Sequence, residues 1–520
     1  MITARIELAE LLEPWSETLD RLTTSDVVRR LWEGDHTVIQ DDPTECADRL
    51  GWLRSPEHSS SQWPRWALAA DEVVDGAGDQ ESGRFTDVLV LGMGGSSLFP
   101  EVLARTFDPG EGFPRITVLD STDPDAVRRV ESSCDPEHTI VVVASKSGST
   151  IETRSHLEHF WERSPIGRQF IAITDPGSAL EALAHERGFR AVFHGDPEIG
   201  GRFSALSAFG MVPAALMGLD ARALLDTAAE ALDLLGPDTP VEEHVGAQLG
   251  ALMAVAATAG RDKLTFHLDP RIEAFGGWLE QLIAESTGKH GHGVLPVLGE
   301  TADAPDPEHR LHVLIGDADV DPAQLSGPWV HLQVEEPEDL GAQIVLWEWA
   351  TTLAGVVLGT NPFDQPDVES AKREARSLLD SDVPGVDPVA AGVEVVTIDE
   401  ALGLLRPGDA LIIGAFVDPA IEPQLQAARQ VLGRRAGVAT TLGIGPRFLH
   451  STGQLHKGGA DRHVVVQVVS SPGTDIGVAG EAFSFGELFR AQADGDLAAL
   501  RAAGKRAVRV DLDELLALAR

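Results

Sequence analysis

A cluster of hydroxyl side chains lies directly after a predicted strand in the first third of the chain. The strand covers residues 139–144, and the sequence Ser145-Lys-Ser-Gly-Ser-Thr-Ile-Glu-Thr153 follows it. Serine and threonine hydroxyls donate hydrogen bonds to phosphate oxygens, and a helix that begins near Thr150 aims free N–H groups at the same place. One hydroxyl is enough to cap a helix. Five hydroxyls and a lysine within nine residues predict a site for a phosphate monoester.

A glycine-rich turn follows another predicted strand, over residues 87–92. Its sequence is Leu91-Gly-Met-Gly-Gly-Ser-Ser-Leu98, and a helix is expected after it. Glycines allow backbone N–H groups to approach an anion, and the helix N-terminus adds its dipole. The turn departs from the dinucleotide fingerprint, because Leu98 stands near the place of the third glycine. Two alternatives stay open, a nucleotide site that uses Asp120 as its acid and a plain strand-to-helix turn.

An arginine between paired glycines and a helical run is the third candidate. The segment is Gly200-Gly-Arg-Phe-Ser-Ala-Leu-Ser207. The glycines let the backbone turn so that Arg202 points into a cleft. There its fixed charge would stabilise an oxyanion. Because the chain has 35 arginines, this segment alone decides nothing.

The elements around these loops predict an α/β protein of two doubly wound parallel-sheet domains with additional helices. Short apolar strands alternate with helical patterns, which is typical of βαβ units. The expected division is a helical segment at 1–84, a first domain at 85–220 with the phosphate loop, a second domain at 221–475, and a C-terminal segment at 476–520. The strands expected in the two domains are 87–92, 116–120, 139–144, 170–174, 191–193, and then 311–315, 330–334, 393–398, 410–415 and 464–469.

The charge of the chain limits its partners. Against 82 acidic side chains stand 41 basic ones, which gives a net charge of −41. Nucleic acid binding is therefore not expected, because a phosphate backbone needs a basic footprint. The same field repels any small anion. A phosphate site must be built locally, from helix N-termini and a few cations.

The apolar segments and the cysteines predict a cytoplasmic protein. No apolar run approaches the roughly 20 residues that a membrane helix needs, so no membrane partner is expected. The N-terminal residues lack the pattern of a secretory signal. The cysteines, Cys46 and Cys134, have no metal-site spacing and form no disulfide framework. A reducing compartment suits them best.

The hydroxyl segment, the Gly-Gly-Arg segment and Gln281-Leu-Ile-Ala-Glu-Ser-Thr-Gly-Lys289 together resemble the phosphoglucose isomerase family. The chain is most similar to the isomerase portion of bacterial bifunctional transaldolase/phosphoglucose isomerase proteins. The resemblance implies two sugar-isomerase (SIS) domains and reversible isomerisation of glucose 6-phosphate and fructose 6-phosphate through an enediolate. It also implies a hexose 6-phosphate as substrate, no metal or organic cofactor, and a homodimer.

By the same resemblance, Glu285 is the catalytic base and Arg202 stabilises the enediolate. A carboxylate suits this role, because the reaction moves one proton between adjacent carbons. Gln281 matches a family residue that contacts the substrate. In the later motif, which runs from Gly359 to Lys372, Gln365 matches a glutamine that contacts the phosphate, and Lys372 matches the lysine that assists ring opening.

The histidine for ring opening is expected in Leu449-His-Ser-Thr-Gly-Gln-Leu-His-Lys-Gly458, which resembles the family's histidine segment. Here that segment follows Lys372, whereas in the family it usually precedes the lysine. We expect His450 to open the ring, with His456 as the alternative, because neutral imidazole exchanges protons near pH 7. Glu152 resembles a family acid that would orient this histidine if the two domains meet.

Residue-level matching also assigns the phosphate ligands. They are Ser96, Ser145, Lys146, Ser147 and Thr150, and Gly95 is expected to take part in substrate binding. Thr287 stands where many relatives have asparagine, which predicts an effect on the pocket near the sugar. Two alternatives to the single activity stay open. One is a dual phosphoglucose/phosphomannose isomerase. The other is a SIS protein that binds a sugar phosphate without chemistry.

Overall fold

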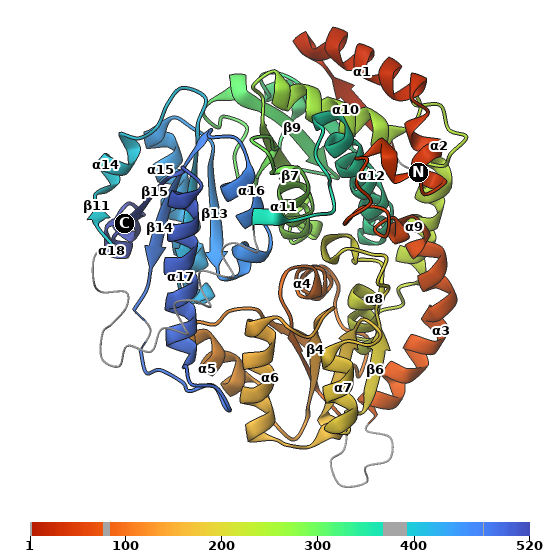
Figure 1. Ribbon diagram of the computed structural model, residues 1–520, viewed down its shortest axis with the longest axis vertical. Coiled ribbons are helices and arrows are strands. Elements are labelled where there is room, and N and C mark those ends of the chain that lie inside the picture. Colours follow the sequence, from red (N-terminus) through yellow and green to blue (C-terminus); the bar gives the residue numbers. More distant parts are fainter. Residues whose placement is uncertain (1–2, 76–83, 368–392, 472, 520) are drawn as a thin grey trace.

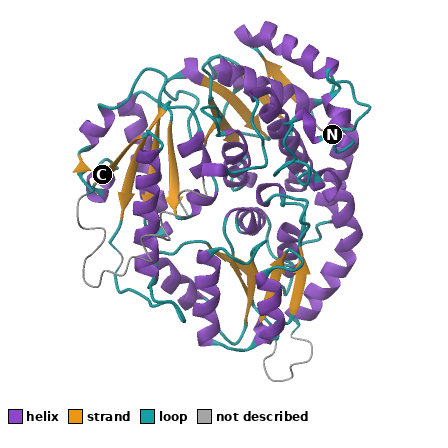
Figure 2. Cartoon of the chain, viewed as in Figure 1, coloured by secondary structure: helices purple, strands orange, loops and turns teal. Residues whose placement is uncertain are grey.

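The structure is a computed structural model that describes residues 3–75, 84–367, 393–471 and 473–519. The described strands form three five-stranded sheets, each covered by helices on both faces (Figures 1 and 2). The ribbon shows the three sheets around the middle of the molecule, where helices α4 (Leu98–Thr106) and α11 (Phe275–Thr287) lie.

The first sheet carries the hydroxyl and glycine segments, and its order is β3-β2-β4-β5-β6 with every pair parallel. Alternate residues of β2 enter different cores, since Leu89 packs with α5, α6 and α7 while Val90 packs with α3, α4 and α8. The elements are β2 (Asp87–Leu91), β3 (Arg115–Leu119), β4 (Thr139–Ala144), β5 (Phe170–Thr174), β6 (Ala191–His194), α3 (Ser55–Val74), α5 (Pro124–Ser133), α6 (Ile151–Arg163), α7 (Ala179–Glu186) and α8 (Ala208–Leu216).

The second sheet has the order β1-β10-β9-β7-β8, and only its edge strand β1 is antiparallel to its neighbour. Its strands are β1 (Ala4–Glu7), β7 (Lys263–Leu268), β8 (Leu295–Val297), β9 (Arg310–Ile315) and β10 (Trp329–Leu332). The helices associated with it are α1 (Leu12–Thr24), α2 (Val27–Trp32), α9 (Arg222–Leu234), α10 (Val245–Thr258), α11 and α12 (Leu340–Leu358).

The third sheet has the order β11-β15-β14-β12-β13, again all parallel. Ile413 of β12 packs against α15, whereas its neighbour Ile412 packs against α11 and α17. The elements are β11 (Val395–Val396), β12 (Ala410–Phe416), β13 (Thr440–Gly445), β14 (His463–Val469), β15 (Arg506–Val510), α14 (Ile398–Leu402), α15 (Glu422–Ala436), α16 (Gly453–Gly458), α17 (Phe485–Ala502) and α18 (Leu512–Ala517).

One helical stretch of the described chain, Pro337–Leu358, is long and apolar enough to cross a membrane by length and composition. In its most apolar window 83% of the residues are buried inside the protein. It contains α12, which packs against α9 and α10. The stretch is therefore a core helix of this fold.

The α/β class with parallel sheets is confirmed. The region expected to form one second domain, 221–475, carries strands of two separate sheets, and residues within 476–520 supply β15 to the third. The segment 1–84 is not wholly helical, because β1 joins the second sheet. The strand–helix alternation indicates which elements form, but it does not say which strands pair with each other. For that reason the sequence could not separate the second sheet from the third.

The five strands predicted for the first sheet are confirmed, with ends that differ by one residue at most. Five described strands were not predicted. Buried polar residues, glycines and charges interrupt their apolar patterns, as with Lys263 in β7, Gly443 in β13 and Arg506 in β15. These strands are β1, β7, β8, β13 and β15.

Candidate active site

Glu285 lies on α11, which is held between the second and third sheets. Leu282 of this helix packs in the core of the second sheet and Ala284 in that of the third. Gln281, one turn before Glu285, shares its helix face. The side-chain amide of Gln281 donates to Glu285 Oε2 at 3.3 Å and to the carbonyl of His450 at 2.8 Å. Both side chains are buried, with 4% of Glu285 and 3% of Gln281 exposed.

Arg202 faces Glu285 from the short helix η6 (Gly201–Phe203). Its Nη1 lies 3.5 Å from Glu285 Oε2, and its Nε donates to Ser286 Oγ at 2.8 Å. Its Nη2 donates to the carbonyls of Pro362 at 2.5 Å and Asp364 at 2.9 Å. Burial lowers the pKa of Arg202, while Glu285 and Asp364 oppose that shift. Guanidinium stays charged in proteins, so a fixed cation stands beside the carboxylate of Glu285.

His450 joins the site from the third sheet, on the short helix η12 (Arg447–His450). Its Nε2 lies 2.8 Å from Oε1 of Glu152, which lies in the first turn of α6. Gln492 of α17 donates to the same carboxylate oxygen at 2.7 Å. A carboxylate at Nε2 places the proton on that nitrogen, which leaves Nδ1 of a neutral ring to exchange a proton. The expected meeting of Glu152 and His450 is thus present.

The hydroxyl turn, residues 145–150, leads into α6. Thr150 is the N-cap residue of α6, but no side chain caps the helix. Ser145 Oγ accepts from the Gly148 N–H at 3.1 Å and lies 3.4 Å from Thr150 Oγ1, while the hydroxyls of Ser147 and Ser149 are 2.7 Å apart. An uncapped helix N-terminus among hydroxyls is a ready anion site. Glu152, two residues on, ties this turn through His450 and Gln281 to Glu285.

Lys146 is engaged elsewhere in this structure. Its Nζ donates to Asp175 Oδ1 at 2.9 Å and to the Asp196 carbonyl at 3.0 Å. It also lies 5.6 Å from the centre of the Phe209 ring. Burial lowers its pKa, and Asp175 opposes that shift. The ammonium is therefore held by neighbouring loops of the first sheet, and a phosphate contact requires it to move.

The glycine turn packs against the arginine segment. Its short helix η4 (Gly94–Ser96) includes Gly94 at φ +56°. A Cβ on Gly94 would lie 2.8 Å from both Gln281 Nε2 and the His450 carbonyl oxygen, and a Cβ on Gly95 only 1.9 Å from the Gly201 carbonyl oxygen. The absence of side chains here lets the loops that carry Arg202, Gln281 and His450 meet.

Because the backbone at Gly95 lies so close to the Gly201 carbonyl, Gly95→Ala is expected to push the two loops apart. It should lower kcat/KM by at least about 10²-fold, since a shift of about 1 Å at the reacting groups costs that much. A steady-state assay measures the effect. Gly477→Ala is the control, because that glycine, like Gly95, has no positive φ, and nothing lies within 4 Å of its Cβ position. A Gly95→Ala enzyme with activity equal to the control would contradict the packing argument.

The structure does not favour the alternative of a nucleotide site at the glycine turn, because Asp120, its expected acid, is already paired. Asp120 Oδ2 forms an ion pair with Nε of Arg447 at 2.8 Å, and Arg447 also pairs with Glu101 at 2.6 Å. The carboxylate thus joins the first sheet to the third. Ser96 is half-buried in the glycine turn, with its N–H on the Met93 carbonyl at 3.2 Å.

Three further sequence-predicted residues have definite positions. His456 is 2% exposed, and burial lowers its pKa well below the usual value, so it belongs to the core around Phe448. Thr287 donates its hydroxyl to the Ile283 carbonyl at 2.8 Å and accepts from the Val294 N–H at 3.0 Å, so this hydroxyl is used within the protein. Gln365 is half-buried just after Asp364. Lys372 lies outside the described residues.

Sequence reasoning gave no role to two residues that hold the site. Lys289 is fully buried, and its Nζ bonds the Asn361 carbonyl and lies 2.8 Å from Asp364 Oδ1. Burial lowers the pKa of Lys289 to about 7, with Arg202 adding to the shift and Asp364 opposing it. The scarcity of lysine in this chain was a usable signal for it. Gln492 carries no local motif and is recognisable only in the folded structure.

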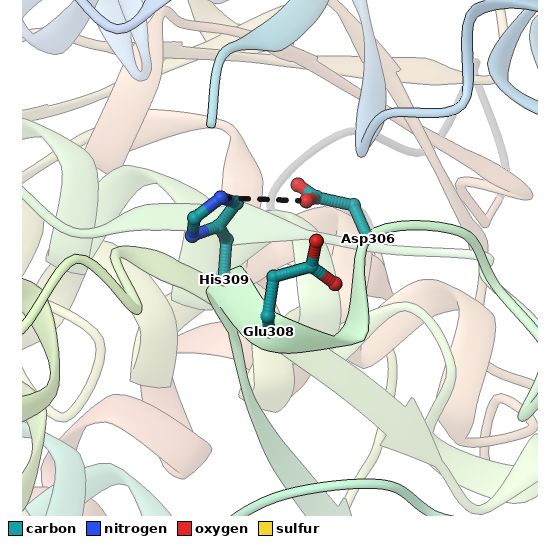
Figure 3. A group of neighbouring side chains, drawn as sticks. All are labelled: Asp306, Glu308 and His309. Carbon is teal, nitrogen blue, oxygen red and sulfur yellow. Dashed lines mark ion pairs between the residues drawn. The ribbon is translucent and has the colours of Figure 1, made fainter. Parts of the chain in front are cut away.

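Other cavities and clusters lie away from Glu285. A cavity of about 270 Å³ lies behind the hydroxyl turn, between α6 and α7, and its lining comes from the first sheet and its helices. Asp306, Glu308 and His309 form a group whose ligand atoms lie within 4.8 Å of one another (Figure 3). This group directly precedes β9, the central strand of the second sheet. Burial raises the pKa of Asp306, while His309 and Lys263 oppose that shift, so positive charge is already present there.

The described fold and geometry define a class, an α/β protein in which a buried carboxylate, an arginine and a carboxylate-bound histidine adjoin an anion-binding turn. The family model described as phosphoglucose isomerase matches residues 70–294. A glucose-6-phosphate isomerase of Synechococcus sp. (strain JA-3-3Ab) is 30% identical over an alignment of 395 residues, and the match covers 63% of this chain and 74% of the relative. One of Geobacter sp. (strain M21) is 31% identical with the same coverage. The chain belongs to the phosphoglucose isomerase family.

Two solved structures are similar to this chain in fold. A hypothetical protein from Thermus thermophilus, TT0462, superimposes with a TM-score of 0.59 at 25% identity, covering 73% of this chain and all of that one. A glucose-6-phosphate isomerase from Chlamydia trachomatis has the same fold, with a TM-score of 0.52 at 21% identity, and covers 69% of this chain and 79% of that one.

Proposed function

We propose that the chain is a glucose-6-phosphate isomerase, which interconverts glucose 6-phosphate and fructose 6-phosphate through an enediolate. One observation carries the proposal. Glu285 Oε2 lies 3.5 Å from Arg202 Nη1, and hydrogen bonds through Gln281, His450 and Glu152 connect it to the hydroxyl turn. A base, a cation for the developing oxyanion and an anion site therefore belong to one connected arrangement.

In the proposed reaction the 6-phosphate binds at Ser145, Ser147 and Thr150 and at the N-terminus of α6. His450, held by Glu152, takes part in ring opening together with Lys372. Glu285 then removes the proton from C2 of the open aldose and returns it to C1, and Arg202 stabilises the negative charge on the enediolate oxygen. Remote binding of the phosphate supplies much of the rate, because it fixes the reacting carbons over Glu285.

Gln281 is proposed to contact a sugar hydroxyl. Its Oε1 is buried and accepts no hydrogen bond from the described residues, while its amide nitrogen is used by Glu285 and His450. A buried acceptor without a donor costs about 1–3 kcal/mol. A substrate hydroxyl would remove that cost. This is the kind of interaction by which a site selects a polyol.

The deciding experiment is an assay of the purified protein with glucose 6-phosphate, fructose 6-phosphate and mannose 6-phosphate. We expect turnover of the first two and exchange of the C1 proton of fructose 6-phosphate in heavy water. Turnover of mannose 6-phosphate as well would identify a dual isomerase. Binding of fructose 6-phosphate without exchange would identify a sugar-phosphate sensor, and would overturn the proposal.

Thr150→Val is expected to lower kcat/KM by about 10-fold, because it removes one hydrogen bond to a charged phosphate. Inorganic phosphate, used as a competitive inhibitor, should lose affinity by the same factor. Ser132→Ala, at the exposed end of α5, is the control, because within the described part of the chain its hydroxyl bonds only the Arg128 carbonyl. Unchanged inhibition by phosphate in the Thr150 variant would place the anion elsewhere.

The remaining assignments extend the proposal. The reaction needs no metal or organic cofactor, and its substrates place the enzyme in hexose-phosphate metabolism. A cytoplasmic location and a homodimer follow from the family. Glu152, Glu285 and His450 meet within one protomer, so a dimer is not needed to complete this part of the site, and native mass measurement tests it. The similarity to bifunctional transaldolase/phosphoglucose isomerases stays a prediction.

A further inference from the structure

A short turn, residues 361–364, connects the end of α12 to Gln365, and two buried cations hold it. Lys289 bonds the Asn361 carbonyl and lies 2.8 Å from the carboxylate of Asp364. Arg202 reaches the same turn from η6 and bonds the carbonyls of Pro362 and Asp364. One residue, Asp364, thus gives its carboxylate to the lysine and its backbone carbonyl to the arginine.

The turn has a defined shape. Asn361 Oδ1 accepts from the Phe363 N–H at 3.0 Å, and its Nδ2 donates to the Glu45 carbonyl at 3.2 Å. The ring of Phe363 packs edge-on against that of Phe203, with centroids 5.1 Å apart. Because Phe203 directly follows Arg202, the turn and the arginine segment form one packed unit.

The charges in this unit can pair in two ways. Arg202 and Lys289 stand among Glu285 and Asp364, so there are two cations and two carboxylates. In the structure the ammonium of Lys289 pairs with the carboxylate of Asp364 at 2.8 Å. Nη1 of Arg202 lies 3.5 Å from the carboxylate of Glu285. Without the ammonium, the carboxylate of Asp364 would be left beside a guanidinium that already bonds its backbone. The side chain of Asp364 is 27% exposed, and without the ammonium its negative charge would attract the adjacent guanidinium.

We propose that Lys289 is a positioning residue for the isomerisation. It occupies the carboxylate of Asp364, so that Arg202 contacts the turn only through carbonyl groups and keeps Nη1 directed at Glu285 and at the enediolate oxygen. Lys289 does not touch the substrate in this role. The inference rests on the proposed isomerase activity, because Arg202 needs a fixed direction only if an oxyanion forms beside Glu285.

The test compares Lys289→Met with the double variant Lys289→Met/Asp364→Asn. The single variant is expected to lower kcat by about 10²-fold, as a shift of about 1 Å in a catalytic group does, with KM changed less than about threefold. The double variant is expected to recover most of that loss, since Asp364 then carries no charge to compete for Arg202. Both rates are measured per folded molecule, with folding followed by circular dichroism.

Lys263→Met is the matched control. Lys263 is also buried, and it also bonds one aspartate, Asp262, and one backbone carbonyl, that of Gly408. It lies at the start of β7, beside Leu295 of β8, and neither of its bonding partners is a residue of the site. Its replacement should lower stability and leave kcat per folded molecule unchanged.

Three results would overturn the inference. In the first, Lys289→Met has the same kcat as the Lys263→Met control. In the second, the double variant is no faster than Lys289→Met. In the third, Lys289→Met changes KM alone and leaves kcat unchanged. If Lys289→Met does not fold, the double variant, which keeps the charge balance, is compared with Asp364→Asn, and a kcat more than about 10-fold below that single variant would overturn it. A failure of the proposed function itself looks different, because the wild-type protein would then show no turnover.

Discussion

Glu285→Gln is expected to lower kcat on the order of 10²- to 10⁴-fold, the contribution of a general base. The amide keeps the size of the side chain and an oxygen facing Arg202, whose Nη1 lies 3.5 Å from the carboxylate. Affinity for fructose 6-phosphate should stay near the wild-type value, because the proposed phosphate site is the hydroxyl turn and does not include Glu285. Coupled kinetics give kcat, and a binding isotherm gives the affinity.

Glu280→Gln is the control for this experiment. Glu280 is the neighbour of Gln281 on α11, and its surroundings contain Glu422, Arg429 and Arg447 rather than Arg202. Burial raises the pKa of Glu280 to about 8, so it too is a perturbed carboxyl group, but one outside the site. Equal losses in the two variants would show that α11 needs its carboxylates for structure, and a loss of binding in Glu285→Gln would remove Glu285 from the chemistry.

Glu348→Met is expected to stabilise the protein, by at least about 2 kcal/mol at pH 8, since an unsatisfied buried polar group costs about 1–3 kcal/mol. Glu348 is 1% exposed in the middle of α12, and neither of its carboxyl oxygens has a hydrogen-bond partner among the described residues. Burial raises its pKa well above the usual value. Methionine fills similar space without a charge to bury.

The gain should grow with pH. In the unfolded chain the carboxyl group ionises near pH 4.3, whereas in the folded protein burial raises its pKa well above that value, so that it ionises only at higher pH. The free energy of unfolding of the wild type therefore falls as pH rises above that value, by up to about 1.4 kcal/mol per pH unit until the folded pKa is reached. Glu348→Met removes this dependence. Urea denaturation at pH 5.5 and pH 8.5 measures it.

Glu300→Gln should have the opposite effect. The side chain of Glu300 is 10% exposed, but it lies 3.7 Å from Arg310 Nη2 and 3.5 Å from Arg429 Nη1. Removing its charge leaves two buried guanidinium groups less compensated, which is destabilising. A loss of stability in Glu348→Met, like the loss expected in Glu300→Gln, would contradict the prediction. It would show that the carboxyl group of Glu348 has a stabilising interaction partner.

The sequence predicts the first sheet and its loops well, because apolar strands of standard length end directly in the glycine and hydroxyl segments. Arg202, Gln281 and Glu285 also lie in short local motifs, and the structure brings them together. The meeting of Glu152 with His450 was expected only from the family resemblance. Nothing local says that α6 of the first sheet and η12 of the third lie side by side, since this depends on how whole sheets pack.

The rest of the site depends on contacts between distant segments. Gln492 holds Glu152 across 340 residues, and Lys289 reaches Asn361 across 72. Neither pair has a periodicity or a spacing that a sequence pattern can detect. Lys146 shows the reverse case. Its place among hydroxyls suggests a phosphate contact, yet a nearby aspartate holds its ammonium.

The bond between Glu152 and Gln492 has a consequence for biosynthesis. A ribosome makes the first sheet, the base and the arginine long before it makes α17, so a growing chain holds most of its catalytic groups while the orienting amide is still absent. Full activity then requires that α17 has been made. A chain that stops before α17 would leave Glu152 without the amide of Gln492 and is expected to turn over poorly.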